Sequence, residues 1–539
     1  MGDLIQSSLL VKKLRLKYPD SKISLLVDEA IMELAENLSG IDVAIGIDMK
    51  GLSLSINRNG HGLVKQYAAF SEAINKLREK RFDMIFNLNY SNISSIIAHL
   101  LNPEELKGFR FSEEERKIVA DPWFSYLINS VSSRRLNRIN LADIFSMADD
   151  GRNEDHASEH ILIGQEELRW AAGILQKHRI GPEQIIIGLN PGAGMSKRQW
   201  PAEYFSKLSD LAVDKLGAKV ILFGISKEEE LGKQIERTGK FETINLIGKT
   251  SLGELIAILS LCRYLVTNDT GTMHIAAAVR TKVVGLFMGP ANCHETGPYG
   301  NGHLILQTNL PCSPCYEDGN CKDQQCRFMI LPEDVFEVMS KDIENRLSDN
   351  SDIKLSNNDI SLFRSEVDRG LVKFLPIAKK EPSFEDILAI CYREMWKSIL
   401  DNEEFLSNDR DMLQELISCY SLPLRNGISG KLWETSQKFS LAADIFGRGG
   451  SLSKKYLDNN LSEDSFEFEV NEIEKLLKDE EDKSLKPLVN FYLLEKKNIT
   501  KRRNSHAKEH LMLFNKMEKG ARFLMKQIKL VESKNEYLC

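Results

Sequence analysis

The sequence predicts an α/β fold in which two successive doubly wound segments are followed by a mostly helical region. Short apolar runs alternate with helical periodicity over residues 23–109, and again more regularly over 185–287. Many of these runs end in polar or glycine-containing turns. Beyond about residue 384 the chain has helical periodicity, many charges and little strand signal. Strands that alternate with helices indicate parallel pairing through right-handed crossovers.

The first doubly wound segment has a weaker pattern than the second, and it fades between Ser112 and Asp155. Apolar spacing predicts its helices, and short apolar runs predict its strands. The expected strands are 23–27, 42–47, 82–88 and 106–109, and the expected helices are 7–18, 68–80 and 94–101.

The second segment repeats the same alternation with cleaner boundaries. Its strands are continuous apolar runs, which are typical of parallel strands buried on both faces. The expected strands are 185–189, 220–224, 243–246, 264–267 and 282–287, and the expected helices are 165–178, 204–215, 227–237 and 251–261.

Four regions follow from these patterns. We expect an N-terminal Rossmann-like domain over 1–160, a second over 161–347, a polar linker over 348–383 and a helical accessory domain over 384–539. Amphipathic stretches in the last region usually indicate an accessory domain, and they leave open a membrane-surface or partner contact.

Composition narrows the functional classes. The 539 residues carry a net charge of −7, which argues against a protein that mainly binds nucleic acid. No apolar run reaches the roughly 18 residues that a membrane span needs, and no signal peptide is visible. The nine cysteines do not suggest a disulfide framework in such a chain. We therefore expect a cytoplasmic protein.

The stretch Asn268–His274 is the strongest candidate site. A strand that ends there and restarts as a helix would leave several backbone N–H groups free for a phosphate. Gly271 would let the backbone approach a ligand closely. Asp269 and His274 would then lie at the rim. The alternative is an ordinary strand-to-helix turn with Asp269 as the N-cap and His274 on the surface.

A second candidate follows the strand at 185–189. The turn Asn190–Gly194 precedes Lys197 and Arg198, and a flexible turn with two cations suits a diphosphate, which Arg can grip at two points. The alternative is a basic surface loop in which Trp200 packs against the next helix.

Four cysteines, Cys312, Cys315, Cys321 and Cys326, form a separate cluster. Four thiolates at this spacing could hold Zn²⁺ or iron in a structural site that pins a loop without a core of its own. The alternative is a set of free or incidentally oxidised cysteines.

The order of these motifs resembles glycosyltransferase family 9, the ADP-heptose:lipopolysaccharide heptosyltransferases. The matching segments are Gly2-Asp3, Asn190–Pro201, Leu246–Leu252 and Asn268–Ala277. The resemblance covers about residues 1–340 and does not extend to the helical C-terminal region.

The resemblance implies a GT-B architecture, with two Rossmann-like domains that face a cleft. It implies inverting transfer of heptose from ADP-heptose, or a related nucleotide-sugar, to a lipopolysaccharide inner-core acceptor at the inner membrane face. No metal is required for catalysis. Asp3 would be the general base. The residues implied in donor binding are Asn190, Gly192, Lys197, Arg198, Gly248, Ser251, Leu252, Asp269, Thr270, Gly271 and His274. The loop with His294, Glu295 and Thr296 would border the same nucleotide-sugar.

One feature departs from the family pattern. A strand precedes the Gly-Asp pair in the family, whereas Met1 directly precedes Gly2 here. We therefore expect the first strand to be missing, through either an upstream start or a remnant gene. Two alternatives stay open: a protein O-heptosyltransferase of the autotransporter-modifying type, and a catalytically impaired nucleotide-sugar-binding or scaffold protein.

Overall fold

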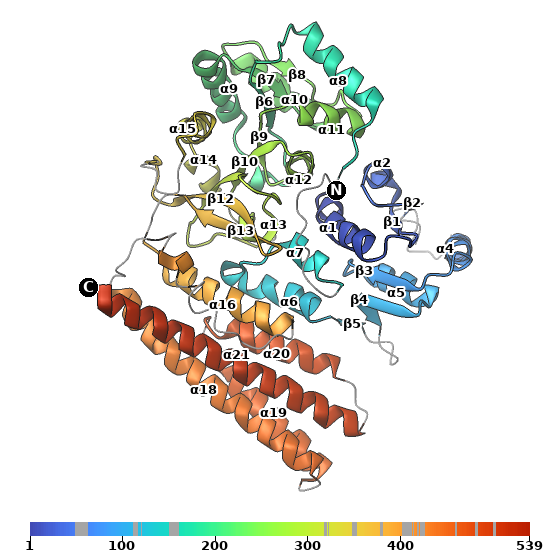
Figure 1. The fold of residues 1–539 in the computed structure, drawn as a ribbon, viewed down its shortest axis with the longest axis vertical. Coiled ribbons are helices and arrows are strands. Elements are labelled where there is room, and N and C mark those ends of the chain that lie inside the picture. The colour runs from blue at the N-terminus through green and yellow to red at the C-terminus, as the bar shows by residue number, and fades with distance from the viewer. Residues whose placement is uncertain are drawn as a thin grey trace. The chain divides into compact units, whose positions relative to one another are not determined.

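The chain forms two compact units, which are described separately (Figure 1). The first unit comprises Met1–Leu77 and Ile139–Ala378, and the second comprises Arg78–Arg138 and Lys379–Cys539. The computed structural model describes residues 1–48, 63–111, 117–119, 121–149, 161–316, 321, 323–347, 353–377, 381–401, 412, 414–417, 420, 426–458, 461–479, 483–499 and 503–538.

An eight-stranded sheet forms the centre of the first unit. Its strand order is β13-β12-β11-β10-β9-β6-β7-β8, parallel from β11 to β8, with β12 and β13 added in antiparallel pairing. The strands are β6 (Ile186–Asn190), β7 (Lys219–Leu222), β8 (Ile244–Asn245), β9 (Tyr264–Asn268), β10 (Lys282–Phe287), β11 (Leu304–Thr308), β12 (Ile360–Asp368) and β13 (Leu371–Pro376).

Helices cover both faces of this sheet because its strands are apolar on both sides. Successive residues alternate between two cores: Leu265 and Val283 belong to one, and Val266 and Val284 to the other. The helices packed on the first core are α8 (Gln165–Lys177), α11 (Leu252–Ser260) and α12 (Gly271–Ala278). Those on the second are α9 (Ala202–Leu216), α10 (Glu229–Thr238) and α15 (Pro332–Ile343). This arrangement confirms the doubly wound fold predicted for the second segment.

The N-terminal residues of the first unit pack around α1 (Gly2–Lys17). This helix is buried along most of its length and contacts both α7 (Leu141–Ser146) and α12. The parallel pair β1 (Ser24–Asp28) and β2 (Val43–Ile47), with α2 (Met32–Glu36), completes this part. The helix α4 (Leu63–Arg78) follows.

The second unit combines a small sheet with a helical bundle. The sheet contains β3 (Met84–Asn87), β4 (Glu105–Phe111) and β5 (Lys117–Val119), with β3 parallel and β5 antiparallel to β4. Its helices are α5 (Asn92–Leu101), α6 (Pro122–Ser130), α16 (Phe384–Leu400), α18 (Asn426–Leu457), α19 (Glu463–Asp479), α20 (Lys486–Asn498) and α21 (Arg503–Leu538). The helical prediction for the C-terminal region is confirmed. None of the helices in the described ranges combines the length and apolar character needed to cross a membrane.

Two expectations need correction. Among the described residues the N-terminal strands form two separate sheets, β1-β2 and β3-β4-β5, and not one. The segment 348–383 is not only a linker, since β12 and β13 extend the large sheet and their apolar residues enter its cores. The boundaries of the four domains otherwise stay a prediction.

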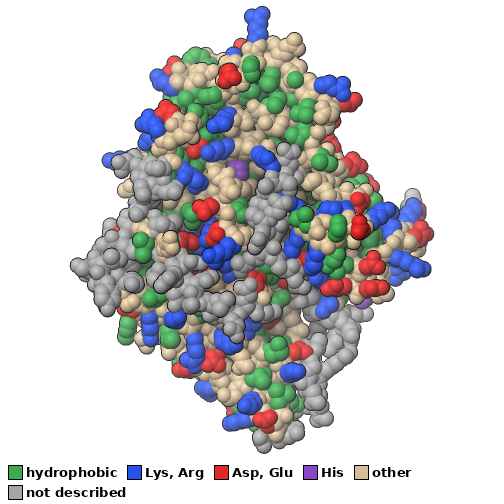
Figure 2. All heavy atoms as spheres, in the orientation of Figure 1, with side chains coloured by type: hydrophobic (Ala, Val, Ile, Leu, Met, Phe, Trp, Pro, Cys, Tyr) green, Lys and Arg blue, Asp and Glu red, His purple; other side chains and the backbone are tan. Residues whose placement is uncertain are grey.

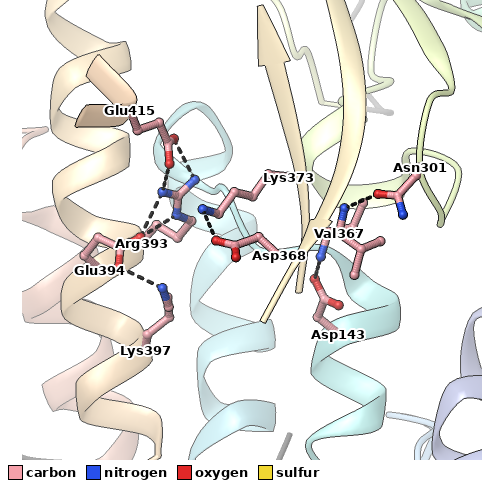
Figure 3. A network of polar contacts seen from close by, with 10 residues as sticks. Asp143, Asn301, Val367, Asp368, Lys373, Arg393, Glu394, Lys397 and Glu415 are labelled. Carbon is pink, nitrogen blue, oxygen red and sulfur yellow. Dashed lines mark hydrogen bonds and ion pairs between the residues drawn. The ribbon is translucent and has the colours of Figure 1, made fainter. Parts of the chain in front are cut away.

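A buried charge network holds α16 in the second unit (Figure 3). The Arg393 guanidinium donates from its two Nη atoms to both carboxylate oxygens of Glu415, at 3.0 and 2.6 Å, and from Nε to Glu394 at 2.9 Å. Lys397 Nζ donates to the other oxygen of Glu394 at 2.8 Å. Burial by itself raises the pKa of Glu394, but Arg393 and Lys397 outweigh it and lower that pKa to about 2.

We predict that this network makes the stability of the chain depend on pH. Because the pKa of Glu394 is lower in the folded state, its contribution is present above about pH 4.5 and is lost as the pH falls toward 2. Glu394→Gln should reduce the acid-dependent fall in free energy of unfolding, by roughly 2–3 kcal/mol over this window. Thermal unfolding followed by circular dichroism between pH 2.5 and 6 measures this.

The matched control is Glu434→Gln, which removes the exposed partner of Lys438 in α18. Exposed pairs contribute at most about 1 kcal/mol, so this variant should follow the parent protein. An unchanged acid dependence in Glu394→Gln would contradict the assignment.

Candidate active site

Two buried asparagines mark the carboxyl edge of the large sheet. Asn190 ends β6 and Asn268 ends β9, and these strands are parallel neighbours, with Asn190 opposite Thr267. The Asn190 side chain donates to the hydroxyls of Thr267 at 3.2 Å and Thr270 at 3.3 Å. The carboxyl edge of an open α/β sheet is where such folds bind their ligands.

Asn268 connects the two polar turns that the sequence singles out. Its Nδ2 donates to the backbone carbonyls of Pro191 at 3.0 Å and Gly192 at 2.9 Å. Its Oδ1 accepts from the backbone N–H of Trp200 at 3.0 Å. One fully buried side chain therefore joins the end of β9 to both ends of the turn after β6.

The turn that carries Lys197 and Arg198, here called the basic turn, contacts the Asn268–His274 stretch through an ion pair. Arg198 Nη1 lies 3.1 Å from Asp269 Oδ2, and the Thr296 hydroxyl donates to Asp269 Oδ1 at 3.3 Å. The Asp269 side chain is only 7% exposed, whereas that of Arg198 is 26% exposed. Asp269 is thus enclosed by its partners and does not lie at a rim as expected, while Arg198 keeps a face toward solvent.

The N-terminus of α12 has no side-chain cap. Thr270 is the N-cap residue, with extended backbone (φ −145°, ψ 167°), and its side chain makes no capping hydrogen bond. The alternative in which Asp269 caps the helix is therefore wrong, because the Asp269 carboxylate is held by Arg198 and Thr296. The first-turn N–H groups of a helix that lacks a cap suit a phosphate.

The predicted base lies near this helix terminus. Asp3 is exposed in the first turn of α1, and α1 packs against α12. The two termini come so close that a Cβ added to Gly2 would lie 3.1 Å from Cδ2 of His274. His274 is buried and not on the surface, and its burial lowers its pKa to about 4. The imidazole is therefore neutral at pH 7.

Further donor-binding candidates lie along the same sheet edge, past β7 and β8. Gly248 has a positive φ of +70°, and its N–H donates to the Gly224 carbonyl at 2.9 Å. Ser251 caps α11 in a reciprocal pair of hydrogen bonds with Glu254, and Leu252 is the first residue of that helix. These contacts give Gly248 and Ser251 local structural roles, and a donor-binding role for them stays a prediction.

Glu228 is a neighbour of the site that the sequence analysis did not identify. A Cβ added to Gly192 would lie 1.9 Å from the Glu228 carboxylate, so the glycine lets this side chain lie directly against the turn after β6. Glu228 belongs to the turn after β7, and the adjacency of β7 and β6 could have pointed to it.

The cysteine-containing loop packs against the basic turn. Gly289, whose carbonyl accepts from the Cys315 N–H at 3.1 Å, has a φ of +62°, and a Cβ there would lie 2.7 Å from the Lys197 carbonyl oxygen. Arg327 Nε donates to the Gln199 carbonyl at 2.6 Å, and Trp200 Nε1 donates to the Ile330 carbonyl at 2.9 Å. The sequence analysis did not identify Arg327, whose partner is far away along the chain.

The four cysteines differ in exposure. Cys312 and Cys321 are exposed, Cys315 is half-buried and Cys326 is buried. Burial raises the pKa of Cys326, and the other three thiols raise it further. Among the described residues, which omit 317–320 and 322, no group of three or more His, Cys, Asp or Glu side chains is placed to hold a metal ion. These positions do not form a ligand set, and the structural metal stays a prediction.

The residues brought together at the edge of β6 and β9 are therefore Asn190, Gly192, Lys197, Arg198, Asp269, Thr270, Gly271 and His274. Lys and Arg side chains gather on the visible face of this part of the chain (Figure 2). Positive charge beside a helix N-terminus can bind an anion, and a turn followed by two cations suits a diphosphate.

The comparisons with known proteins agree with this geometry. Residues 71–325 match glycosyltransferase family 9 (heptosyltransferase). The chain is 26% identical over 324 residues to lipooligosaccharide heptosyltransferase 2 of Haemophilus influenzae, covering 57% of this chain and 86% of that protein. It is 34% identical over 164 residues to lipooligosaccharide heptosyltransferase 2 of Campylobacter jejuni, covering 29% and 51%.

A solved structure supports the fold. The family 9 glycosyl transferase from Veillonella parvula DSM 2008 has a TM-score of 0.52 and 23% sequence identity, and covers 64% of this chain and 95% of that one. The GT-B fold class expected from the sequence is thereby confirmed. Residues 71–325 of the chain thus match glycosyltransferase family 9, the heptosyltransferase family.

Proposed function

We propose that the chain transfers heptose from ADP-heptose to a lipopolysaccharide inner-core acceptor, with inversion at the anomeric carbon. The names of its relatives, which are heptosyltransferases of lipooligosaccharide, support the sugar and the acceptor class. The observation that carries the proposal is the Arg198–Asp269 pair beside the N-terminus of α12, with the start of α1 against His274.

In this mechanism Asp3 accepts the proton of the acceptor hydroxyl. The hydroxyl oxygen then forms a bond to C1 of the heptose while the bond between C1 and the diphosphate oxygen breaks, and ADP leaves with the bonding electron pair. General-base assistance of this kind contributes about 10²- to 10⁴-fold to a rate. Because Asp3 is exposed, an acceptor hydroxyl can reach it from solvent.

The departing ADP gains negative charge, which the donor site would stabilise. Arg198 and Lys197 supply positive charge, and the backbone N–H groups around Thr270 and Gly271 supply donors. Asp269 holds Arg198 in place before the donor arrives. We further propose that the enzyme works in the cytoplasm, peripherally to the inner membrane, where such an acceptor would be found.

Changing Arg198 should weaken nucleotide binding. Arg198→Lys keeps the charge but loses the two-point grip, so ADP affinity should fall about 10- to 100-fold. Isothermal titration with ADP measures this. Arg237→Lys, which alters an exposed Arg–Glu pair in the same unit, is the matched control and should bind ADP normally. Parent-like affinity in Arg198→Lys would remove Arg198 from the site.

Changing Asp3 should separate chemistry from binding. Asp3→Asn should lower turnover of ADP-heptose about 10²- to 10⁴-fold, because the amide cannot accept the proton. The thermal shift produced by ADP should stay as in the parent, whereas the exposed Asp20→Asn variant should change neither quantity.

The acceptor is tested in the same assay with lipopolysaccharide inner core and with a protein substrate in parallel. Heptose found by mass spectrometry only on the protein would favour a protein O-heptosyltransferase. Absence of turnover with both acceptors, together with an ADP thermal shift, would favour the binding or scaffold alternative.

A further inference from the structure

The longest helix, α21, presents one regular row of exposed side chains. Between residues 506 and 533 its exposed positions recur with spacings of four and three, which places them on one face of an α-helix. The remaining positions on this stretch are buried or half-buried. The exposed residues, here called the basic stripe, are Lys508, Met512, Asn515, Lys519, Arg522, Lys526 and Lys529.

The charged residues of the basic stripe are all positive. Five of its seven residues are Lys or Arg and none is acidic, in a chain whose net charge is −7. The acidic residues Glu509, Glu518 and Glu532 are half-buried beside it. Glu518 and Asp444 pair with Arg522, but within the described part of the chain Lys508, Lys519 and Lys529 make no ion pair. Three lysines spread over about 30 Å of helix are thus available to an external anion.

The neighbouring helix α18 extends the positive surface. Helices α18 and α21 lie side by side within the second unit (Figure 1) and pack along much of their lengths. Asp444 of α18 pairs with Arg522 of the stripe, and Arg448 and Lys455 follow Asp444 by four and eleven residues. Both are exposed, so the face of α18 next to the stripe carries two further cations.

We propose that the basic stripe docks the enzyme on an anionic membrane surface, through the phosphates of lipid headgroups. A straight row of lysines suits a flat array of phosphates, whereas a single soluble anion would need convergent groups. The apolar side of α21 is buried in the bundle, so attraction is electrostatic and the helix does not insert. Met512, which is 65% exposed within the row, is the one large apolar side chain that meets the headgroups.

The membrane is chosen over a nucleic acid on two grounds. The net charge of −7 would repel a long polyanion over the rest of the surface. The choice also rests on the proposed function, in which the acceptor is lipid-linked. The stripe is outside residues 71–325, so docking would be a property of the C-terminal region and not of the family 9 domain.

The test uses the full chain and vesicles, without donor or acceptor. The parent protein should co-sediment with vesicles of phosphatidylglycerol and phosphatidylcholine, but not with phosphatidylcholine alone, and 0.5 M NaCl should release it. Lys508→Gln/Lys519→Gln/Lys529→Gln should lower the partition coefficient between vesicles and solution roughly 100-fold. Removing one lysine near such a surface lowers this coefficient about fivefold.

A triple variant of exposed lysines in the first unit, Lys177→Gln/Lys233→Gln/Lys240→Gln, loses the same charge and should bind vesicles like the parent. Equal losses in the two triple variants, or no binding of the parent to anionic vesicles, would overturn the proposal. So would stripe-dependent binding of duplex DNA without binding to vesicles. Both triple variants should keep the thermal shift that ADP produces. Absence of that shift would contradict the proposed donor site and not the proposed docking surface. The two proposals can therefore fail independently.

Discussion

The arrangement of the turns at the carboxyl edge of the large sheet depends on the side chain of Asn268. This carboxamide is fully buried and satisfies three backbone groups, the carbonyls of Pro191 and Gly192 and the N–H of Trp200. Each such group would cost about 1–3 kcal/mol if it were left buried without a partner. No aliphatic residue can replace the amide, because both its donor and its acceptor atoms are used. A single residue at the end of β9 thereby sets the course of the chain that carries Lys197 and Arg198.

The contacts of Trp200 extend this constraint to the cysteine-containing loop. The Trp200 indole donates to Ile330, and Arg327 donates to the Gln199 carbonyl beside it. The basic turn is thus held from β9 on one side and from the segment after the cysteines on the other. A turn fixed at both ends can present Arg198 without reorganisation, which is how a rigid site stabilises charge that develops during a reaction.

The sequence was most informative where local pattern decides structure. The strands and helices of 185–287 follow from continuous apolar runs and helical spacing, and the turns at Asn190 and Asn268 meet because β6 and β9 are parallel neighbours. It was least informative where long-range contacts decide. Polar stretches surround β12 and β13, and these two strands form through long-range pairing of β12 with β11 and of β13 with β12. Asp269 is enclosed partly by Thr296, and Glu228 lies against Gly192. Both contacts join residues that are far apart in the sequence, so no short stretch of sequence predicts them.

The charge balance of the site follows from burial. His274 is neutral at pH 7 because burial lowers its pKa to about 4, so it cannot supply positive charge to a diphosphate. Asp269, also buried, already uses one Nη of Arg198. A guanidinium carries its N–H donors in a planar fork, and the Arg198 side chain keeps 26% of its surface exposed. In the proposed function this exposed face meets the diphosphate, while the pair with Asp269 fixes the orientation of the fork. A lysine has no planar fork and could not be oriented in the same way.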